Sequence, residues 1–216
     1  GLNESINYSN VMLSRYFLSA FFVRQFSVVW VVFTFEEDAL LGRVSPYIIQ
    51  PLHPFIRYFA QHIAEQITRF PFALIIASFF FLFNPESRWI PNLTILFLSC
   101  IATFFSFLTQ FLIQSIIACL CFWTEKASSI ERLLFIPTLF LSGLLAPVIS
   151  FPEYVKSWIY LTPFPYLIDF PANLLSGNET NISGGLIMQI LWIFILFPLF
   201  KKIWSEGTKK YTAMGS

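Results

Sequence analysis

The feature that most constrains the fold is a stretch of 31 residues, 93–123, that contains no charged side chain. About 20 apolar residues in helical form are enough to cross the hydrocarbon core of a bilayer, which is about 30 Å thick. Composition points the same way, because 56% of the residues are hydrophobic and only 12% are charged, against about 25% charged in an ordinary soluble domain. The sequence therefore predicts an integral membrane protein and excludes a water-soluble fold.

Further apolar stretches with charges mainly at their ends predict an all-α polytopic membrane protein with a single transmembrane domain over residues 1–216. We expect about five transmembrane helices, at 11–35, 58–83, 93–123, 133–151 and 184–200. The third is the clearest, and the first is the least clean because polar residues interrupt it.

The distribution of Lys and Arg between the segments predicts the orientation. Eight of these residues fall on one side of the predicted spans, in segments 36–57, 124–132 and 201–216, and two fall on the other side, in segments 1–10, 84–92 and 152–183. Basic residues are retained on the cytoplasmic side of membrane proteins. We therefore expect a multi-pass protein of the cell membrane with an external start and a cytoplasmic C-terminus.

A cytoplasmic segment, 36–57, combines an acidic cluster with turn-forming residues, and Pro54 suits the first turn of the helix that follows. In that helix Glu65 and Arg69 form an i,i+4 pair on a polar face. The pattern favours a short rigid element that docks a cytoplasmic partner, and an interfacial helix lying at the headgroups is the alternative. The candidate docking residues are Glu36, Glu37, Asp38, Gly42, Arg43, Gln50, Pro51 and Pro54.

A second informative segment, 142–177, contains five prolines and many aromatic residues. Proline breaks helices, so this segment predicts a broken helical element at the outer membrane face. Irregular backbone at membrane depth needs protein or a water-filled cavity around it, which favours a place on a transport pathway over a plain surface loop. The candidate residues of an external gate or mouth are Gly143, Pro147, Phe151, Pro152, Pro163, Phe164, Tyr166, Phe170 and Pro171.

Three arginines lie inside the predicted spans, where a charge usually faces a bundle interior or an aqueous path. These are Arg15, Arg24 and Arg69. Arg69 is near the cytoplasmic end of its helix and can extend to the headgroups. Arg24 falls in the middle of the first span, so either the boundary is misplaced or the side chain lines a contact within the protein.

Sequence motifs for metal or nucleotide chemistry are missing. His53 and His62 are nine residues apart without a His/Glu motif, and the three cysteines, Cys100, Cys119 and Cys121, lie in one apolar stretch. Neither pattern predicts a metal site or a disulfide. No GxxxxGK[ST] loop is present, so any energy from ATP has to come through a partner.

Several short pieces, in order along the chain, resemble one family. They are Phe122-Trp123-Thr124-Glu125, Phe140-Leu-Ser-Gly143-Leu-Leu-Ala-Pro147, Phe151-Pro152, Leu161-Thr-Pro163-Phe164, Phe170-Pro171-Ala172, Gly177 and the tail Gly207-Thr-Lys-Lys-Tyr211-Thr-Ala-Met-Gly215. Together with the acidic, proline-bearing segment 37–54, they look like the ABC type 2 (ABC-2) transporter permeases, in particular the bacterial and cyanobacterial exporter branch.

This resemblance implies a permease subunit with six spans, paired with a second permease and with two cytoplasmic ABC ATPase subunits that bind ATP and Mg. The chain itself would bind no cofactor and would not be an enzyme. Segment 36–54 would couple to the ATPase, and segment 147–177 would cover the external mouth. Because only five spans are predicted here, we expect that the first transmembrane helix of the family is missing.

Two other classes of function remain open from the residues. One is a non-ABC membrane scaffold or anchor, which would tolerate substitution of Gly143 and Pro147. The other is an intramembrane enzyme, for which the third span offers only Gln110, Gln114 and small hydroxyls, groups that more often bond between helices. Lipid is an expected partner and nucleic acid is not; the transported substrate and the identity of the second permease stay open.

Overall fold

The computed structural model describes residues 10–179 and 181–214, and in this part of the chain every regular element is helical. The expected external placement of residues 1–9 lies outside the described residues. The α-helices are α1 (Asn10–Ser27), α2 (Val31–Leu40), α3 (Val44–Ile48), α4 (Pro54–Phe83), α5 (Leu93–Cys119), α6 (Ala127–Leu141), α7 (Glu153–Ile159), α8 (Asp169–Ser176) and α9 (Ile182–Met214). Short 3₁₀ turns are η1 (Pro85–Ser87), η2 (Leu120–Phe122), η3 (Val148–Ser150) and η4 (Phe164–Tyr166).

Four segments are long and apolar enough to cross a membrane: Val11–Leu40, Pro54–Phe83, Leu93–Phe122 and Ile182–Tyr211, each of 30 residues. At 1.5 Å per residue, such a helix is about 45 Å long. These segments confirm the all-helical membrane class and correspond to four of the five expected spans.

The remaining expected span, 133–151, falls on α6, which has 15 residues and ends at Leu141. A helix of that length is about 22 Å long, which is less than the hydrocarbon thickness of about 30 Å. Beyond α6 the chain turns at Gly143, with φ of 86°, and continues into η3. The count of five spans is therefore not established by helix length.

The first span is not one continuous helix. α1 ends at Ser27 and α2 begins at Val31, and residues 28–30 between them are not helical. The last helix, in contrast, continues well past the expected end at residue 200 and reaches Met214.

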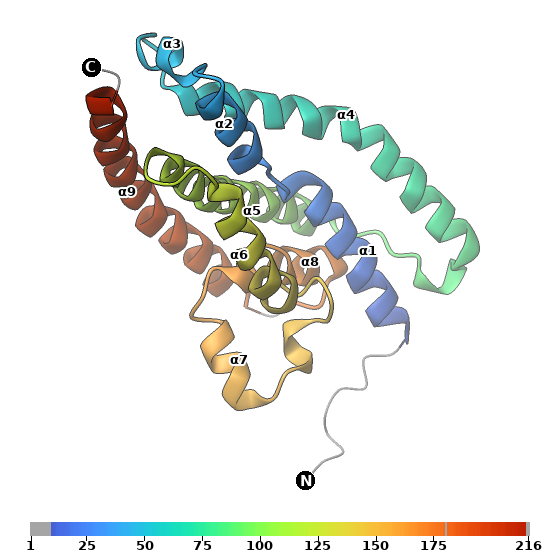
Figure 1. The fold of residues 1–216 in the computed structure, drawn as a ribbon. Coiled ribbons are helices and arrows are strands. Elements are labelled where there is room, and N and C mark those ends of the chain that lie inside the picture. Colours follow the sequence, from blue (N-terminus) through green and yellow to red (C-terminus); the bar gives the residue numbers. More distant parts are fainter. Residues whose placement is uncertain (1–9, 180, 215–216) are drawn as a thin grey trace.

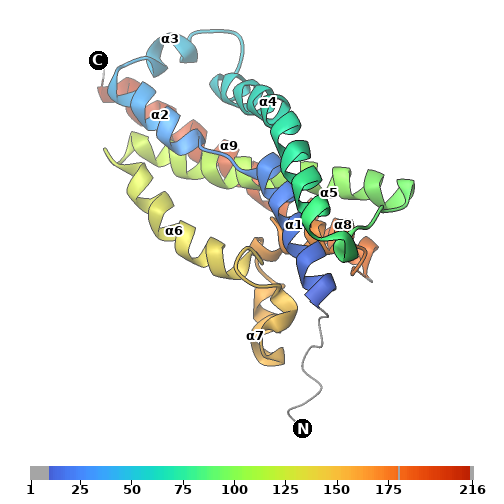
Figure 2. The same cartoon turned by 90° about the vertical axis from the view of Figure 1, so that its right-hand side faces the viewer.

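α5 lies at the centre of the bundle and packs against α1, α2, α6, α8 and α9. Figures 1 and 2 show that α3 and the end of α9 lie at one end of the molecule, and that α7 lies at the opposite end. An aromatic core that includes Phe35, Phe55, Phe107 and Phe200 fills the bundle and extends to Val44 at the start of α3. The outer face of α4 carries exposed apolar side chains, as a helix in contact with lipid does; examples are Phe72, Phe79 and Phe83.

Candidate functional site

The loop between α2 and α4 is held in place by a buried carboxylate. Asp38 is 6% exposed and accepts a hydrogen bond from the Tyr58 hydroxyl at 2.7 Å. Its other oxygen lies 3.4 Å from a guanidinium nitrogen of Arg43. Gly42, with φ of 70°, makes the turn that brings Arg43 back toward Asp38. Asp38, one of the predicted docking residues, thus positions the loop from within the protein.

Glu36 contacts α6 instead of the loop, an interaction that was not predicted from the sequence. Its two carboxylate oxygens accept hydrogen bonds from the Ser128 amide at 2.7 Å and from the Ser128 hydroxyl at 2.9 Å. Ser128 is in the first turn of α6, where backbone N–H groups lack helical partners and the helix dipole favours a negative charge. Glu36 therefore fastens α2 to the start of α6.

Between α2 and α4 the chain presents an exposed apolar surface, which we call the tip and define as residues 40–52. Its most exposed apolar side chains are Leu40, Leu41, Ile49 and Leu52, with exposed fractions of 67%, 57%, 86% and 65%. The Ser45 hydroxyl lies 2.8 Å from the Tyr211 hydroxyl, so the tip also contacts the end of α9. Contiguous exposed apolar side chains of this kind mark interaction sites.

The other predicted docking residues divide between surface and interior. Glu37, Gln50 and Pro51 are exposed, and Glu37 lies 3.8 Å from Arg43. Pro54 is buried and is the first residue of α4. The residue before it, His53, caps this helix, because its ring nitrogen Nδ1 accepts a hydrogen bond from the Phe55 amide at 3.3 Å.

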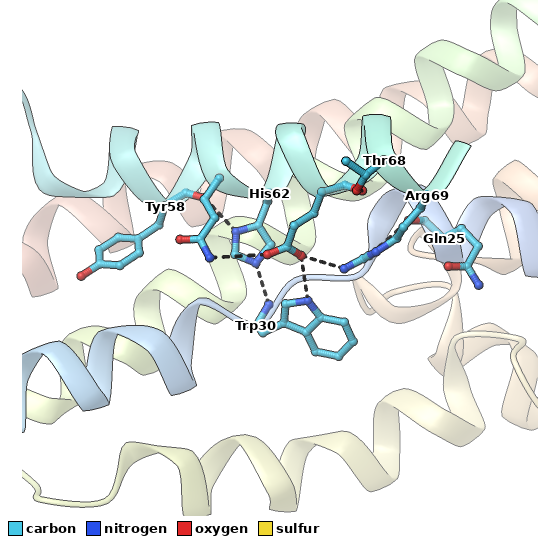
Figure 3. Close-up of polar contacts among 8 residues, drawn as sticks. Gln25, Trp30, Tyr58, His62, Thr68 and Arg69 are labelled. Atoms are coloured by element: carbon cyan, nitrogen blue, oxygen red, sulfur yellow. Dashed lines mark hydrogen bonds and ion pairs between the residues drawn. The ribbon is translucent and has the colours of Figure 1, made fainter. Parts of the chain in front are cut away.

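The break in the first span is stabilised from α4, as Figure 3 shows. His62 is 2% exposed; its Nε2 accepts a hydrogen bond from the Trp30 amide at 3.0 Å, and its Nδ1 lies 2.7 Å from the Tyr58 carbonyl oxygen. Since an amide N–H can only donate and a carbonyl can only accept, these partners assign the neutral ring with its proton on Nδ1. His62 thus satisfies a backbone donor that the break releases.

One turn further along α4, the predicted Glu65–Arg69 pair is confirmed, with 2.7 Å between the carboxylate and the guanidinium. The same Glu65 oxygen accepts a hydrogen bond from the Trp30 indole at 3.3 Å, and a guanidinium nitrogen of Arg69 lies 3.5 Å from the Gln25 carbonyl oxygen (Figure 3). Glu65 therefore contacts Trp30 at the end of the break, and Arg69 contacts the last turn of α1 and lies 5.5 Å from the centre of the Trp30 ring. Arg15, near the start of α1, instead donates to the carbonyl oxygens of Ser87 and Arg88.

At the opposite end, Asp169 joins three segments. Its Oδ1 accepts a hydrogen bond from the Val148 amide at 2.9 Å and lies 2.8 Å from the Tyr16 hydroxyl, which is 2.7 Å from the Gly143 carbonyl oxygen. A Cβ added at Gly143 would lie 2.7 Å from the Asp169 Cβ, so the contact leaves no room for a side chain. Gly143 is thus required for the close approach of α1, the turn after α6 and α8.

The inner part of segment 142–177 lies deep in the bundle. The Ser106 hydroxyl, at the middle of α5, donates a hydrogen bond to the Leu167 carbonyl. Ser106 is about 20 Å along α5 from Leu93. Gln189 of α9 is fully buried, and its Nε2 lies 2.9 Å from the carbonyl oxygens of both Ala102 and Tyr166.

The predicted residues of the external mouth differ in how deeply they are buried. Those deepest in the bundle are buried: Tyr166, Phe170 and Pro171. Gly143 and Pro147 are buried in the turn after α6, whereas Phe151 is partly buried and Pro152 is exposed next to α7. Pro163 and Phe164 line a cavity of about 170 Å³ between α5 and α6.

A larger cavity, of about 320 Å³, lies between the break in the first span, α5, α6 and residues 167–168. Its walls are mostly apolar, with polar groups contributed by Arg24, Gln110, Glu131, Arg132 and Ser142. Arg24 is in the last turn of α1, three residues before the end of that helix. α1 therefore ends close to Arg24, and the Arg24 side chain borders this cavity.

In the described ranges, 10–179 and 181–214, no three His, Cys, Asp or Glu side chains are grouped so that they could hold a metal ion.

The profile of the family described as ABC-2 family transporter protein matches residues 8–215, nearly the whole chain. The chain belongs to the ABC-2 transporter family. Membrane components of this family typically have no ATPase domain of their own and generally pair with ATPase subunits. No curated protein and no solved structure gives a significant match to this ABC-2 protein.

Several residues that organise this ABC-2 transporter protein were not among the predicted ones. Tyr16, His62, Ser106 and Gln189 are buried polar side chains at helix contacts. A polar residue on an apolar helix is a general signal for a contact between helices, but the sequence alone does not indicate which partner it contacts.

Proposed function

We propose that this chain is the membrane-spanning subunit of an ATP-driven exporter, which moves its substrate outward by alternating access between two permease subunits. Separate ATPase subunits supply the energy through the tip. The observation that carries this proposal is the tip itself: in an ABC-2 family chain, four exposed apolar side chains project from a loop whose shape is fixed by the buried Asp38.

The orientation in this proposal is that the tip and the end of α9 face the cytoplasm. Eight of the ten basic residues counted outside the predicted spans belong to that side, and the Ser45–Tyr211 contact is consistent with a common location of the tip and α9. In the proposed topology α6 is the additional crossing, extended toward the outer face by segment 142–177.

The connection from the tip to the interior supports the alternating-access mechanism. Glu36 links α2 to α6 through Ser128, and α2 and α6 both border the larger cavity. Movement of the tip by a partner would therefore shift two walls of the cavity together. The chain would bias an equilibrium between two arrangements of the bundle and would carry out no chemistry itself.

The test is co-expression of the chain with ATPases encoded next to it. We expect one ATPase to co-purify, and Ile49→Asp in the tip to abolish co-purification. Ile90→Asp is the matched control, because Ile90 is 95% exposed in the loop after α4, away from the tip. The Glu37→Lys change probes the exposed charge of α2 next to the tip without replacing the buried Asp38.

Two results would overturn the proposal. One is that no ATPase co-purifies with the unmodified chain. The other is that Ile49→Asp and Ile90→Asp variants retain the same amount of ATPase and the same ATP hydrolysis rate. Orientation is checked separately with a membrane-impermeant thiol reagent on intact cells: a cysteine at Asn178 should be labelled and a cysteine at Lys209 should be protected.

A further inference from the structure

Two arginines differ from the rest in having no partner. The other five arginines each contact a carbonyl oxygen, a carboxylate or an aromatic ring: Arg15 with Arg88, Arg43 with Asp38, Arg57 with Tyr47, Arg69 with Glu65, and Arg88 with Phe81. Among the residues that the structure describes, the side chains of Arg24 and Arg132 have neither a hydrogen bond, an ion pair nor a ring contact.

Both of these arginines line the same cavity, the one of about 320 Å³. They come from different walls, Arg24 from α1 and Arg132 from α6. Ser142, which is fully buried, also lines the cavity, and its hydroxyl has no hydrogen-bond partner in the described part of the chain. The cavity therefore contains three polar side chains whose bonding capacity is unused.

The position of Arg24 makes an unpaired charge expensive. It lies near the middle of the first span, Val11–Leu40, where a charged side chain is costly to place in a bilayer. Its place in the last turn of α1 offsets only part of this cost through the helix dipole. A guanidinium is well suited to bind a carboxylate or phosphate through two parallel hydrogen bonds, so an anion in the cavity would supply the missing partner.

The rest of the cavity indicates what such an anion is attached to. Trp30, Phe33, Phe135 and Leu139 form much of the wall, and these side chains favour an apolar body. Glu131 is the one acidic side chain on the wall, and its carboxylate already accepts a hydrogen bond from Gln114 Nε2 at 2.9 Å. Two free guanidinium groups and one engaged carboxylate favour an anionic ligand over a cationic one.

We propose that this cavity binds an amphipathic anion, with a carboxylate or phosphate headgroup between Arg24 and Arg132 and an apolar chain against Trp30, Phe33 and Phe135. As an assignment of the transported substrate class, this rests on the proposed permease function. Binding itself does not depend on an ATPase, so it is tested on the isolated chain.

The test uses the purified chain in phosphatidylcholine nanodiscs and an undecanoic acid probe that carries a dansyl group at its far end. Energy transfer from Trp30 to the dansyl group reports occupancy, and Trp30→Phe identifies the contribution of this tryptophan. The matched probe has the same chain and dansyl group with a trimethylammonium headgroup. We expect the carboxylate probe to bind at least about tenfold more tightly than the ammonium probe, the ratio that one ion pair of about 1.4 kcal/mol provides.

Substitutions then locate the site. Arg24→Gln and Arg132→Gln should each weaken the carboxylate probe about tenfold, and Arg24→Lys and Arg132→Lys should restore part of the affinity because they restore the charge. Lys202→Gln is the control that removes a positive charge from the exposed surface of α9. Size-exclusion profiles identify any glutamine variant that has lost its fold. The lysine variants keep the positive charge, so their affinity for the carboxylate probe still tests the site if a glutamine variant does not fold.

The outcomes are distinct. Equal affinity for the two probes, or carboxylate binding that is unchanged in both glutamine variants, would overturn the anion site. If added phosphatidylglycerol competes with the probe in an Arg24-dependent manner, the resident anion is a membrane lipid; if it does not compete, the ligand is a non-lipid amphipathic acid. Anion binding without ATPase co-purification would leave this site standing and contradict only the proposed transport function.

Discussion

His62 Nε2 accepts a hydrogen bond from the Trp30 backbone amide at 3.0 Å, across the break in the first span. His62→Ala leaves this part-buried donor without a partner, which costs up to about 1–3 kcal/mol. We therefore expect the free energy of unfolding to fall by that amount, measured by denaturant titration in detergent micelles. Gln61→Ala, on the adjacent exposed position of α4, should change it by less than about 0.5 kcal/mol. Equal stability of the two variants would show that the break does not need His62.

Two of the glycines with positive φ, Gly42 and Gly143, form a matched pair. Gly42 has φ of 70° and no atom within 4 Å of an added Cβ, whereas Gly143 has φ of 86° and an added Cβ there meets Tyr16 and Asp169. Gly42→Ala should cost about 1–2 kcal/mol from backbone strain alone. Gly143→Ala should cost about 1–3 kcal/mol more, because the methyl group overpacks the contact. Thermal unfolding of both variants checks the difference, and tolerance of Gly143→Ala would favour the scaffold alternative.

The link between Glu36 and α6 predicts a local effect. Removing the carboxylate with Glu36→Ala deprives the Ser128 amide of its acceptor, and loss of a helix cap costs about 0.5–2 kcal/mol. Amide hydrogen exchange should therefore accelerate at residues 127–131 and change little in α9. Glu37→Ala, which removes a neighbouring but exposed carboxylate, should leave the exchange of α6 as it is. Unchanged exchange in the Glu36 variant would contradict the link.

His53 predicts a dependence on pH. Partial burial, followed by the positive charge of Lys201, lowers the pKa of His53 from its ordinary value of 6.5. The unfolded chain therefore takes up this proton first, so stability starts to fall as the pH drops through about 6.5 and the loss is complete below the folded-state pKa. The neutral ring is also the acceptor for the Phe55 amide.

We expect thermal stability to decrease between pH 7.5 and pH 5 and His53→Asn to reduce this decrease, since asparagine caps the helix without titrating. The melting temperature of both proteins across this range provides the measurement. A decrease of the same size in the asparagine variant would assign the pH effect to other groups.

The sequence was a reliable guide to the membrane class because lipid imposes length and polarity on every crossing helix. The charge-free stretch 93–123 therefore gave α5 nearly to the residue, and the Glu65–Arg69 pair followed from helical spacing alone. The break at residues 28–30 was not foreseen, since no proline or glycine marks it. It depends on His62, whose partner lies 32 residues away.

In the candidate site, too, contacts between residues far apart in the sequence could not be predicted. An acidic cluster in a cytoplasmic loop indicates a polar surface, yet Glu36 and Asp38 bind Ser128 and Tyr58 inside the protein. The exposed apolar side chains of the tip, such as Ile49 and Leu52, were not selected because apolar residues next to a membrane have many ordinary locations. Contacts across the bundle decide which side chains remain free, and spacing along one helix does not contain that information.

Leu167 and Ile168 form part of the wall of the larger cavity, and they also belong to the stretch whose carbonyl groups Ser106 and Gln189 hold. On this side the wall of the cavity is therefore a turn of chain between η4 and α8 and not a long helix. Each of the hydrogen bonds that retain this stretch contributes about 1 kcal/mol net. The Leu167 and Ile168 side chains are only 3% and 6% exposed, and burial of each contributes roughly 1.5–3 kcal/mol more, so apolar packing as well as hydrogen bonding holds this wall of the cavity in place.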